Sequence, residues 1–378
     1  MHVEQLTYAS GRWWGALDAP QQATGAQLVL VFGERRVLLD GAWLESLRAR
    51  YPAADIVSCS GGGHILGTHV SDAGLVATAI LLESGHVEAV DAALPSAGVS
   101  ETVGATLAGR LPAEGLRHVL VFAEGLHVNG SGLARGLTTS LPPGVAVSGG
   151  LAADDDRFEQ TAVGLNAVPA SGRVVAVGLY GEALDVGVGS VGGWDAFGDE
   201  HRITRSSGNV LFELDGRKAL ELYKELLGPL GYALPASGLM FPLKVRENRD
   251  DAGVVRTILG VDEDAGSLTF AGDVPQGWSA TLVRTNLDQL IRAAGAAARR
   301  TGPARALGAS SFALAVSCIG RKLLLQQRVG EELTSARRAL GETTLAGFYS
   351  YGELAPSTRE APCELHNQTM TITRFSER

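Results

Sequence analysis

The stretch "QLVLVFGERRVLLDGAWLESLRARYPAADIVSCSGGGHI", residues 27–65, decides the fold because its plan occurs twice more along the chain. It runs from an apolar strand through a loop and an amphipathic stretch to a second strand that ends in small residues. Residues 117–155, which begin "RHVLVF", and residues 310–354, which begin "SSFALAVS", follow the same plan. A recurring order of elements indicates a repeated structural unit.

The first strand of every unit is apolar throughout, as "LVLVF", "HVLVF" and "FALAVS" show. A strand covered on both faces needs this character, whereas a half-solvated strand alternates apolar and polar residues. In the third unit, "VGEELTSARRALG" sets apolar residues on one helical face and stops at Gly341, as a capping glycine would. We therefore expect central strands, in parallel or mixed pairing, with helices on the sheet faces.

The middle of the chain has a different pattern. Residues 172–214 are rich in valine and glycine with short alternations, which predicts an antiparallel meander. Two helices are expected after it: "DGRKALELYKELLGP", capped by Asp215, and "NLDQLIRAAGAAARR". The polar stretch "TRSSGN", residues 204–209, predicts a boundary between domains 1–205 and 206–378. The expected fold class is mixed α/β, with two pseudo-repeated domains of stacked mixed β-sheets flanked by helices.

Composition argues against several classes of protein. The 378 residues are 45% hydrophobic and 19% charged, and no stretch approaches the length of a membrane span. A net charge of −9 without a long Lys or Arg cluster argues against nucleic acid as a partner. The first residues lack a signal-peptide pattern, and Cys59, Cys318 and Cys363 are widely spaced. We therefore expect a cytoplasmic protein without disulfides and without a membrane partner.

The strand end "SCSGGGHILG", residues 58–67, is the first candidate site. Cys59 could be a nucleophile, the glycines could offer N–H groups to a ligand, or the stretch could be a tight turn after a buried strand. With Ser60 as the nucleophile, Ser58 stands where a G-x-S-x-G elbow needs its first glycine. A buried structural thiol is the favoured interpretation of Cys59. Cys59 and Ser60 are the nucleophiles of the alternative interpretation, an enzyme.

Comparable turns, "SGGLAADDD" and "FYSYGEL", end two further strands. In open α/β sheets, ligands bind outside the carboxyl ends of the strands, where such turns face a crevice. We therefore expect the three turns to gather at one ligand pocket. The predicted ligand-binding residues are Cys59, Ser60, Gly61, Gly62, His64, Gly149, Gly150, Asp154, Arg321, Tyr349, Tyr351 and Glu353.

Part of this set would suit an amino acid. Arg321, in "SCIGRK", offers a guanidinium that can bind a ligand carboxylate through two N–H groups, although a surface arginine is an equal alternative. Tyr349 and Tyr351 point the same way by strand alternation. Together with Glu353, their hydroxyl groups could hold a ligand ammonium group.

Three further patterns in the sequence favour structural roles or fit a site only in part. "NGSGLARG", residues 129–136, has Arg135 where a dinucleotide-binding loop needs its third glycine. "LAADDDRF" lacks the spacing of a calcium loop and predicts a solvated acidic turn. In "CELHNQTMTIT", His366 is the first choice for a haem axial ligand and Cys363 the second, although a histidine in a terminal strand is more often hydrogen-bonded core.

Several stretches together resemble the FIST family, in which a FIST N part is followed by a FIST C part. The resemblance lies in "SCSGGGHILG", "SGGLAADDDRFEQTAV", "VVAVGLYGEALDVGVGSVGGW", "GNVLFELDGRKALELYKELLG", "SCIGRK" and "LAGFYSYGELAP", followed by "CELHNQTMTIT". It covers nearly the whole chain in the expected order. One departure is His64, which stands where many relatives carry a glutamate.

The resemblance implies an intracellular small-ligand sensor, with amino acids suggested as ligands and a separate protein as the signalling output. Some relatives bind haem and sense nitric oxide, and others recognise substrates for ubiquitin ligases. We therefore expect a non-catalytic sensory protein that needs no cofactor. A haem-binding nitric oxide sensor and a cysteine- or serine-dependent hydrolase are the alternatives.

Overall fold

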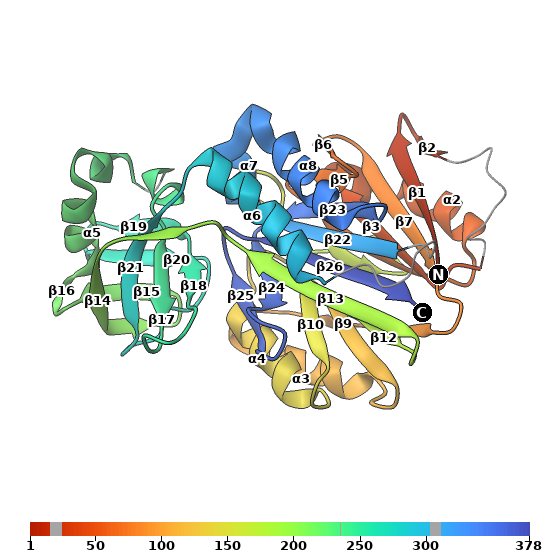
Figure 1. Ribbon diagram of the computed structural model, residues 1–378, viewed down its shortest axis with the longest axis horizontal. Coiled ribbons are helices and arrows are strands. Elements are labelled where there is room, and N and C mark those ends of the chain that lie inside the picture. The colour runs from red at the N-terminus through yellow and green to blue at the C-terminus, as the bar shows by residue number, and fades with distance from the viewer. Residues whose placement is uncertain (16–24, 235, 303–310) are drawn as a thin grey trace.

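The computed structural model describes residues 1–15, 25–234, 236–302 and 311–378. Three six-stranded sheets form a large core, and a smaller β-domain lies beside it, on the left of Figure 1. Each of the three repeated units of the sequence supplies central strands of one large sheet. Mixed sheets flanked by helices in two domains are therefore confirmed.

The large sheets are called first, second and third, in the order in which the repeated units occur. The first sheet has the order β11-β4-β3-β7-β1-β2 and consists of β1 (His2–Ala9), β2 (Arg12–Gly15), β3 (Leu28–Gly33), β4 (Asp55–Ser60), β7 (Leu75–Leu81) and β11 (Val163–Leu165). The second has the order β25-β24-β10-β9-β12-β8 and consists of β8 (His86–Ala93), β9 (Leu116–Ala123), β10 (Ala146–Leu151), β12 (Arg173–Tyr180), β24 (Gly352–Pro356) and β25 (Cys363–His366). The third has the order β13-β26-β22-β23-β5-β6 and consists of β5 (His64–Leu66), β6 (His69–Ser71), β13 (Leu184–Val191), β22 (Ser311–Cys318), β23 (Thr344–Ser350) and β26 (Met370–Glu377).

Each repeated unit contributes one parallel strand pair. Strand β3 pairs in parallel with β4, β9 with β10, and β22 with β23. The chain between the paired strands forms α1 (Arg35–Asp40) and α2 (Ala42–Arg50), then α4 (Gly130–Ser140), then α7 (Ile319–Leu325) and α8 (Val329–Leu340). Every residue of β3 and β22 is buried, so the uninterrupted apolar runs did predict strands covered on both faces.

The three sheets pack around a shared apolar core. Phe32 of the first sheet stacks on Phe348 of the third, with ring centroids 4.8 Å apart. Phe122 of the second sheet lies 5.6 Å from the Phe32 ring and 6.2 Å from the Phe348 ring. Full burial of one such ring is worth about 1.5–3 kcal/mol, so this trio is a main contact between the sheets.

The small domain, residues 195–284, is inserted between β13 of the third sheet and α6 (Leu287–Arg300), which packs on that sheet. The chain enters and leaves it side by side, since Asp195 pairs with Arg284. Its core, which includes Ile203 and Phe270, forms a cluster of its own. Its elements are β14 (Asp195–Ser207), β15 (Val210–Leu214), β16 (Arg217–Lys218), α5 (Ala219–Leu227), β17 (Leu243–Arg246), β18 (Val254–Arg256), β19 (Ile258–Asp262), β20 (Ser267–Phe270) and β21 (Ser279–Arg284).

Three local predictions differ from the structure. The predicted boundary at residue 205 falls inside β14, because the first four residues of "TRSSGN" belong to this strand and only Gly208, with a φ of +55°, and Asn209 form the hairpin turn. Strands β12 and β13 do not pair with each other: after Gly181 the chain passes from the second sheet to the third. Asp215 lies in the turn between β15 and β16 and does not cap α5, which begins at Ala219.

The two other helix predictions are confirmed. Helix α6 begins with a capping box, in which the side chain of Asn286 accepts a hydrogen bond from the Gln289 N–H and the Gln289 side chain bonds back to the Asn286 N–H. Helix α8 ends at Gly341, which adopts a φ of +68°. Leu333 and Ala336 bury the predicted apolar face of α8.

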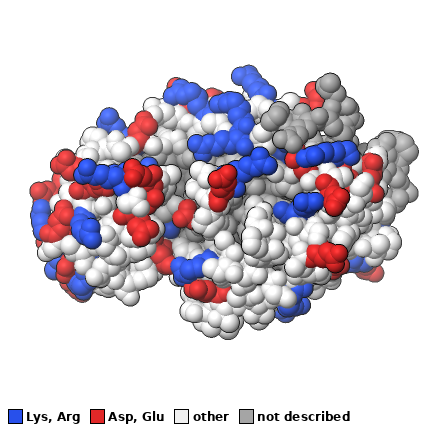
Figure 2. Space-filling view, turned by 60° about the horizontal axis from the view of Figure 1, so that its bottom comes forward, with Lys and Arg blue, Asp and Glu red and all other residues white. Residues whose placement is uncertain are grey.

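Charged side chains are unevenly spread over the surface in Figure 2. Lysine, arginine, aspartate and glutamate are interspersed on the small domain, whereas the lower part of the core carries few of them on this face. Helices α4 and α3 (Ser100–Arg110), at the bottom of Figure 1, pack closely on each other. Among the described residues, no helix combines the length and apolar character needed to cross a membrane.

Candidate ligand-binding site

The three strand ends that the sequence predicted to gather do meet. The N–H of Ala153, after β10, donates to the carbonyl oxygen of Ser60 at 2.9 Å. The N–H of Gly62, after β4, donates to the carbonyl oxygen of Tyr349 at 2.8 Å. The N–H of Tyr351, after β23, donates to the carbonyl oxygen of Leu151 at 3.3 Å. These backbone bonds form a closed ring that joins the three sheets.

The glycine run after β4 serves this junction. The N–H groups of Gly61 and Gly62 both donate to backbone carbonyl oxygens, so they are not free to bind an anion. A Cβ atom at Gly62 would lie 2.6 Å from Cδ1 of Ile319, and one at Gly61 would lie 3.0 Å from Cβ of Phe348. The glycines therefore allow the sheets to approach closely.

Gly149 and Gly150 have a similar role inside β10. A Cβ atom at Gly149 would lie 1.9 Å from the Val121 carbonyl oxygen, and one at Gly150 would lie 2.5 Å from Cγ1 of Val316. Both positions lie in the buried part of the strand. They permit close packing against the neighbouring strand and the third sheet.

Cys59 and Ser60 are both fully buried at the end of β4. Burial raises the pKa of the Cys59 thiol, whose Sγ donates only to the Ser60 carbonyl oxygen in the described part of the chain. The Ser60 hydroxyl oxygen accepts a hydrogen bond from the Ala162 N–H at 3.0 Å. Among the described residues, neither side chain is hydrogen-bonded to a base that could activate a nucleophile.

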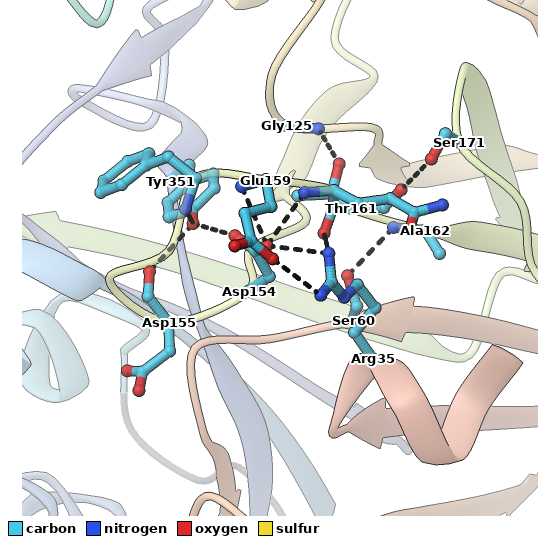
Figure 3. A network of polar contacts seen from close by, with 12 residues as sticks. Arg35, Ser60, Gly125, Asp154, Asp155, Glu159, Thr161, Ala162, Ser171 and Tyr351 are labelled. Carbon is cyan, nitrogen blue, oxygen red and sulfur yellow. Dashed lines mark hydrogen bonds and ion pairs between the residues drawn. The ribbon is translucent and has the colours of Figure 1, made fainter.

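Asp154 is the centre of a polar network beside the ring of strand ends (Figure 3). Its carboxylate accepts a hydrogen bond from Arg35 at 3.1 Å and from the N–H groups of Glu159 and Gln160. The hydroxyl of Tyr351 also donates to it. Arg35, Asp154 and Tyr351 come from the three different units, so Asp154 is a buried link between them, whereas Asp156 lies exposed in the turn, as predicted.

Tyr351 connects this network to a cavity. Its ring stacks on Phe158, with centroids 4.4 Å apart and planes 8° from parallel. Burial and the Asp154 carboxylate raise the pKa of the Tyr351 hydroxyl, which therefore stays protonated as a donor. The same ring lines a cavity of about 380 Å³.

The cavity lies between the small domain and the strand ends of the second and third sheets. On the core side it is lined by Gly125, Leu126, Val128, Leu151, Phe158, Cys318, Ile319, Gly320, Leu323, Tyr351 and Asn367. On the small-domain side it is lined by Asn209, Leu234, Leu239, Thr257, Ile258, Leu259, Phe270 and Ala271. Its walls are mostly apolar and carry no charged side chain among these residues. Its volume falls in the usual range of ligand pockets.

Asn367 is the distinctive residue of this cavity. Its side chain is only 1% exposed, and neither its Nδ2 nor its Oδ1 atom has a hydrogen-bond partner among the described residues. Thr257 is a second lining residue whose buried hydroxyl lacks a partner there. Buried polar groups are normally paired, so these atoms are suited to bind a ligand. No sequence motif pointed to Asn367, because one asparagine in a loop carries no spacing signal.

Arg321 and Tyr349 lie away from the cavity, in the third repeated unit. The Arg321 guanidinium is fully buried and pairs with Glu332 at 2.8 Å. It also donates to the carbonyl oxygens of Gly192 and Leu290. The Tyr349 hydroxyl donates to Glu332 at 2.7 Å. These contacts occupy the groups that were predicted to bind an amino acid, and neither residue lines the cavity.

Glu353 is buried in β24 and also lies away from the cavity lining. Its carboxylate accepts hydrogen bonds from the hydroxyls of Ser350 and Thr369, at 2.5 and 2.9 Å. Burial raises its pKa to about 8, against these hydrogen bonds. Of the four residues proposed for an amino-acid site, only Tyr351 reaches the cavity.

His64 is buried in β5, where it pairs with Phe348 of β23. Burial lowers its pKa to about 4, so the ring is neutral at pH 7. Lys322 lies at the glycine run that precedes His64: it donates to the Gly62 carbonyl oxygen and pairs with Asp72 and Asp155. Lys322 thus fastens the first glycine turn to α7.

His366 and Cys363, the residues considered for haem, lie in β25. Nε2 of His366 is 2.9 Å from the Ala355 carbonyl oxygen, and burial lowers the pKa of the ring to about 4. Neither residue lines the cavity described above, and the described residues contain no group of three His, Cys, Asp or Glu side chains that could hold a metal ion. The two residues that the sequence offered as haem ligands are therefore not placed to bind haem in that cavity.

The glycine-rich "NGSGLARG" stretch forms the start of α4. The Asn129 side chain caps the helix by accepting a hydrogen bond from the Gly132 N–H at 2.8 Å. A Cβ atom at Gly136 would lie 2.0 Å from the Glu101 carbonyl oxygen of α3. The pattern therefore serves helix capping and helix packing.

The chain belongs to the FIST family. Residues 27–217 match the family model of the FIST N domain, and residues 219–356 match that of the FIST C domain. FIST domains are signal-transduction sensory modules. The junction between the two matches lies inside the small domain, which both parts therefore share.

Relatives and a solved structure were also found. The chain is 30% identical over 247 residues to the uncharacterized protein Mb0898c of Mycobacterium bovis, a match that covers 62% of this chain and 61% of that protein. It is 27% identical over 232 residues to the uncharacterized protein MT0656 of Mycobacterium tuberculosis, with 58% of each covered. A crystal structure of cyanuric acid hydrolase from A. caulinodans aligns over 100% of this chain and 99% of that chain, with a TM-score of 0.38 and 10% identity.

Proposed function

We propose that the protein senses a small, uncharged and mainly apolar molecule, which binds in the cavity between the small domain and the core. The observation that carries this proposal is the amide of Asn367, which is buried in the cavity wall and whose donor and acceptor both lack partners in the part of the chain that the structure describes. A ligand with one hydrogen-bonding group could satisfy either atom. Leaving such a group unpaired costs about 1–3 kcal/mol.

The lining favours an uncharged ligand over an amino acid. A zwitterion needs partners for its carboxylate and its ammonium group, and burial without them is strongly unfavourable. The lining offers none, and Arg321 and Glu353 already have other partners. A ligand that fills this cavity would instead contact apolar side chains such as Leu323 and Phe270.

The position of the cavity supports a sensory role. A ligand bound there touches both the small domain and the core, so it would favour one arrangement of the two. We propose that a separate cytoplasmic protein responds to this arrangement. The three cysteines are free and buried, as is usual in a reducing compartment.

Native mass spectrometry of the purified protein, compared with its denatured mass, tests the proposal. A removable ligand should appear in the wild type and in Ala265→Phe, which alters an exposed turn, but not in Ala271→Phe, which fills the cavity. If the protein purifies without a ligand, the same three proteins are compared in a thermal-shift screen of uncharged amphipathic compounds. Equal binding by both variants, or a covalent adduct on Cys59 or Ser60, would contradict the proposal.

A further inference from the structure

A second cavity, of about 350 Å³, lies at the other end of the parallel strands of the second sheet. Ala146, at the start of β10, lines this second cavity, whereas Leu151, at the end of β10, lines the first. At about 3.3 Å per strand residue, the two positions are roughly 17 Å apart. The two cavities are therefore separate sites.

The second cavity differs from the first in its charge. Its charged lining residues are Arg117, Arg300, Arg359, Arg374 and Asp185. The local excess is three positive charges, in a chain whose net charge is −9. His118 also lines it, but burial lowers its pKa to about 3, so the ring adds no charge at pH 7.

Three of the guanidinium groups retain donors for a ligand. Arg117 donates to the Gly181 carbonyl oxygen, and Arg300 donates to that of Ser190. Each guanidinium has five N–H groups, so each of these two arginines keeps most of its donors for a ligand. Arg359 is exposed and forms no hydrogen bond or ion pair with the described residues. The backbone bonds hold the first two side chains in place at the cavity.

We propose that this second cavity binds a small molecule that carries a phosphate group. Guanidinium groups bind phosphate oxygens in pairs, and a dianion matches the excess of positive charge better than a single carboxylate does. A structural ion-pair cluster would balance its charges, which this cavity does not. The proposal is independent of the function proposed for the first cavity.

The site is formed by separate parts of the core. Arg117 lies near the start of β9 in the second sheet, whereas Arg300 ends α6, which packs on β13 and β26 of the third. Arg374 of β26 is buried and donates to the Thr301 carbonyl oxygen at 3.2 Å. A bound phosphate group would therefore bridge the second and third sheets.

Isothermal titration with pyrophosphate, at low ionic strength, tests this inference. We expect saturable binding that weakens at least tenfold in the double variant Arg117→Gln/Arg359→Gln. The matched control, Arg36→Gln/Arg157→Gln, removes two exposed arginines outside the cavity and should bind like the wild type. Circular dichroism should show all three proteins folded.

Three results would overturn the inference. One is no saturable binding of pyrophosphate by the wild type. Another is equal weakening in the control variant, which would indicate general attraction between charges. The third is tighter binding of citrate than of pyrophosphate, which would assign the cavity to carboxylates.

Discussion

Replacing Asn367 with leucine should stabilise the ligand-free protein while it weakens ligand binding. The side chain is 1% exposed, and both of its amide atoms lack partners among the described residues. Each unpaired buried group costs about 1–3 kcal/mol, and water in a cavity of about 380 Å³ can recover part of that cost. We therefore expect a gain of about 1–2 kcal/mol in the free energy of unfolding.

Urea and thermal unfolding of the ligand-free protein measure this gain. With an unfolding entropy of about 2.1 cal/mol/K per residue, it corresponds to a rise of about 1–3 °C in the melting temperature. Asn209→Leu is the matched control, because Asn209 lines the same cavity but its Nδ2 donates to the Phe270 carbonyl oxygen at 2.7 Å. That variant should lose about 0.5–1.5 kcal/mol.

Ligand affinity gives the second half of the test. Asn367→Leu should bind the ligand about tenfold more weakly, since it removes the donor and the acceptor that the ligand would meet. If Asn367 only stabilised the fold, its replacement would instead lower the free energy of unfolding and leave the ligand affinity unchanged. Clear destabilisation by Asn367→Leu with unchanged affinity would refute the reasoning.

Three further outcomes are expected from the core. In urea unfolding, Arg321→Met should lower the free energy of unfolding by about 3–5 kcal/mol, because it leaves Glu332 buried without its ion pair. The double variant Arg321→Met/Glu332→Leu should recover most of that loss. Gly136→Ala should destabilise the protein, because the added Cβ would lie 2.0 Å from the backbone of the neighbouring helix. The control Gly109→Ala has open space around the added Cβ and should raise the free energy of unfolding by about 0.5–1 kcal/mol in the same assay. Burial raises the pKa of Glu353 to about 8 in the folded protein, so the stability that it contributes is present at low pH and is lost as the pH rises through 8. Urea titrations from pH 5 to 8 should therefore show Glu353→Gln gaining stability relative to the wild type by at most about 1.4 kcal/mol per pH unit, and parallel profiles would contradict this.

The repeated pattern predicted much of the core. Apolar runs predicted the strands that are buried on both faces. The spacing of apolar residues predicted helix α8, and the glycine after it predicted where the helix ends. The assignment of strands to sheets could not be predicted in this way, because it depends on long-range pairing. Strands β12 and β13 are neighbours in sequence, yet they lie in different sheets.

The candidate site was also predictable from the sequence only in part. The meeting of the three strand ends was predictable from small-residue turns, and Tyr351, one of the predicted ligand-binding residues, lines the cavity. The chemistry of Arg321 was not predictable, because its partner Glu332 lies on α8 and only the folded chain brings the two together. Asn367 has no sequence signature at all, since its unpaired state is a property of its surroundings.

The insertion of the small domain has a consequence for how this architecture can vary. The chain enters and leaves the domain through paired residues, Asp195 and Arg284, and the Thr285 hydroxyl donates to the Gly193 carbonyl oxygen at 2.6 Å just outside them. Two ends held this close could be joined by a short hairpin without moving the core. One wall of the cavity is therefore exchangeable in evolution or by engineering, while the three-sheet scaffold that carries Asn367 stays as it is.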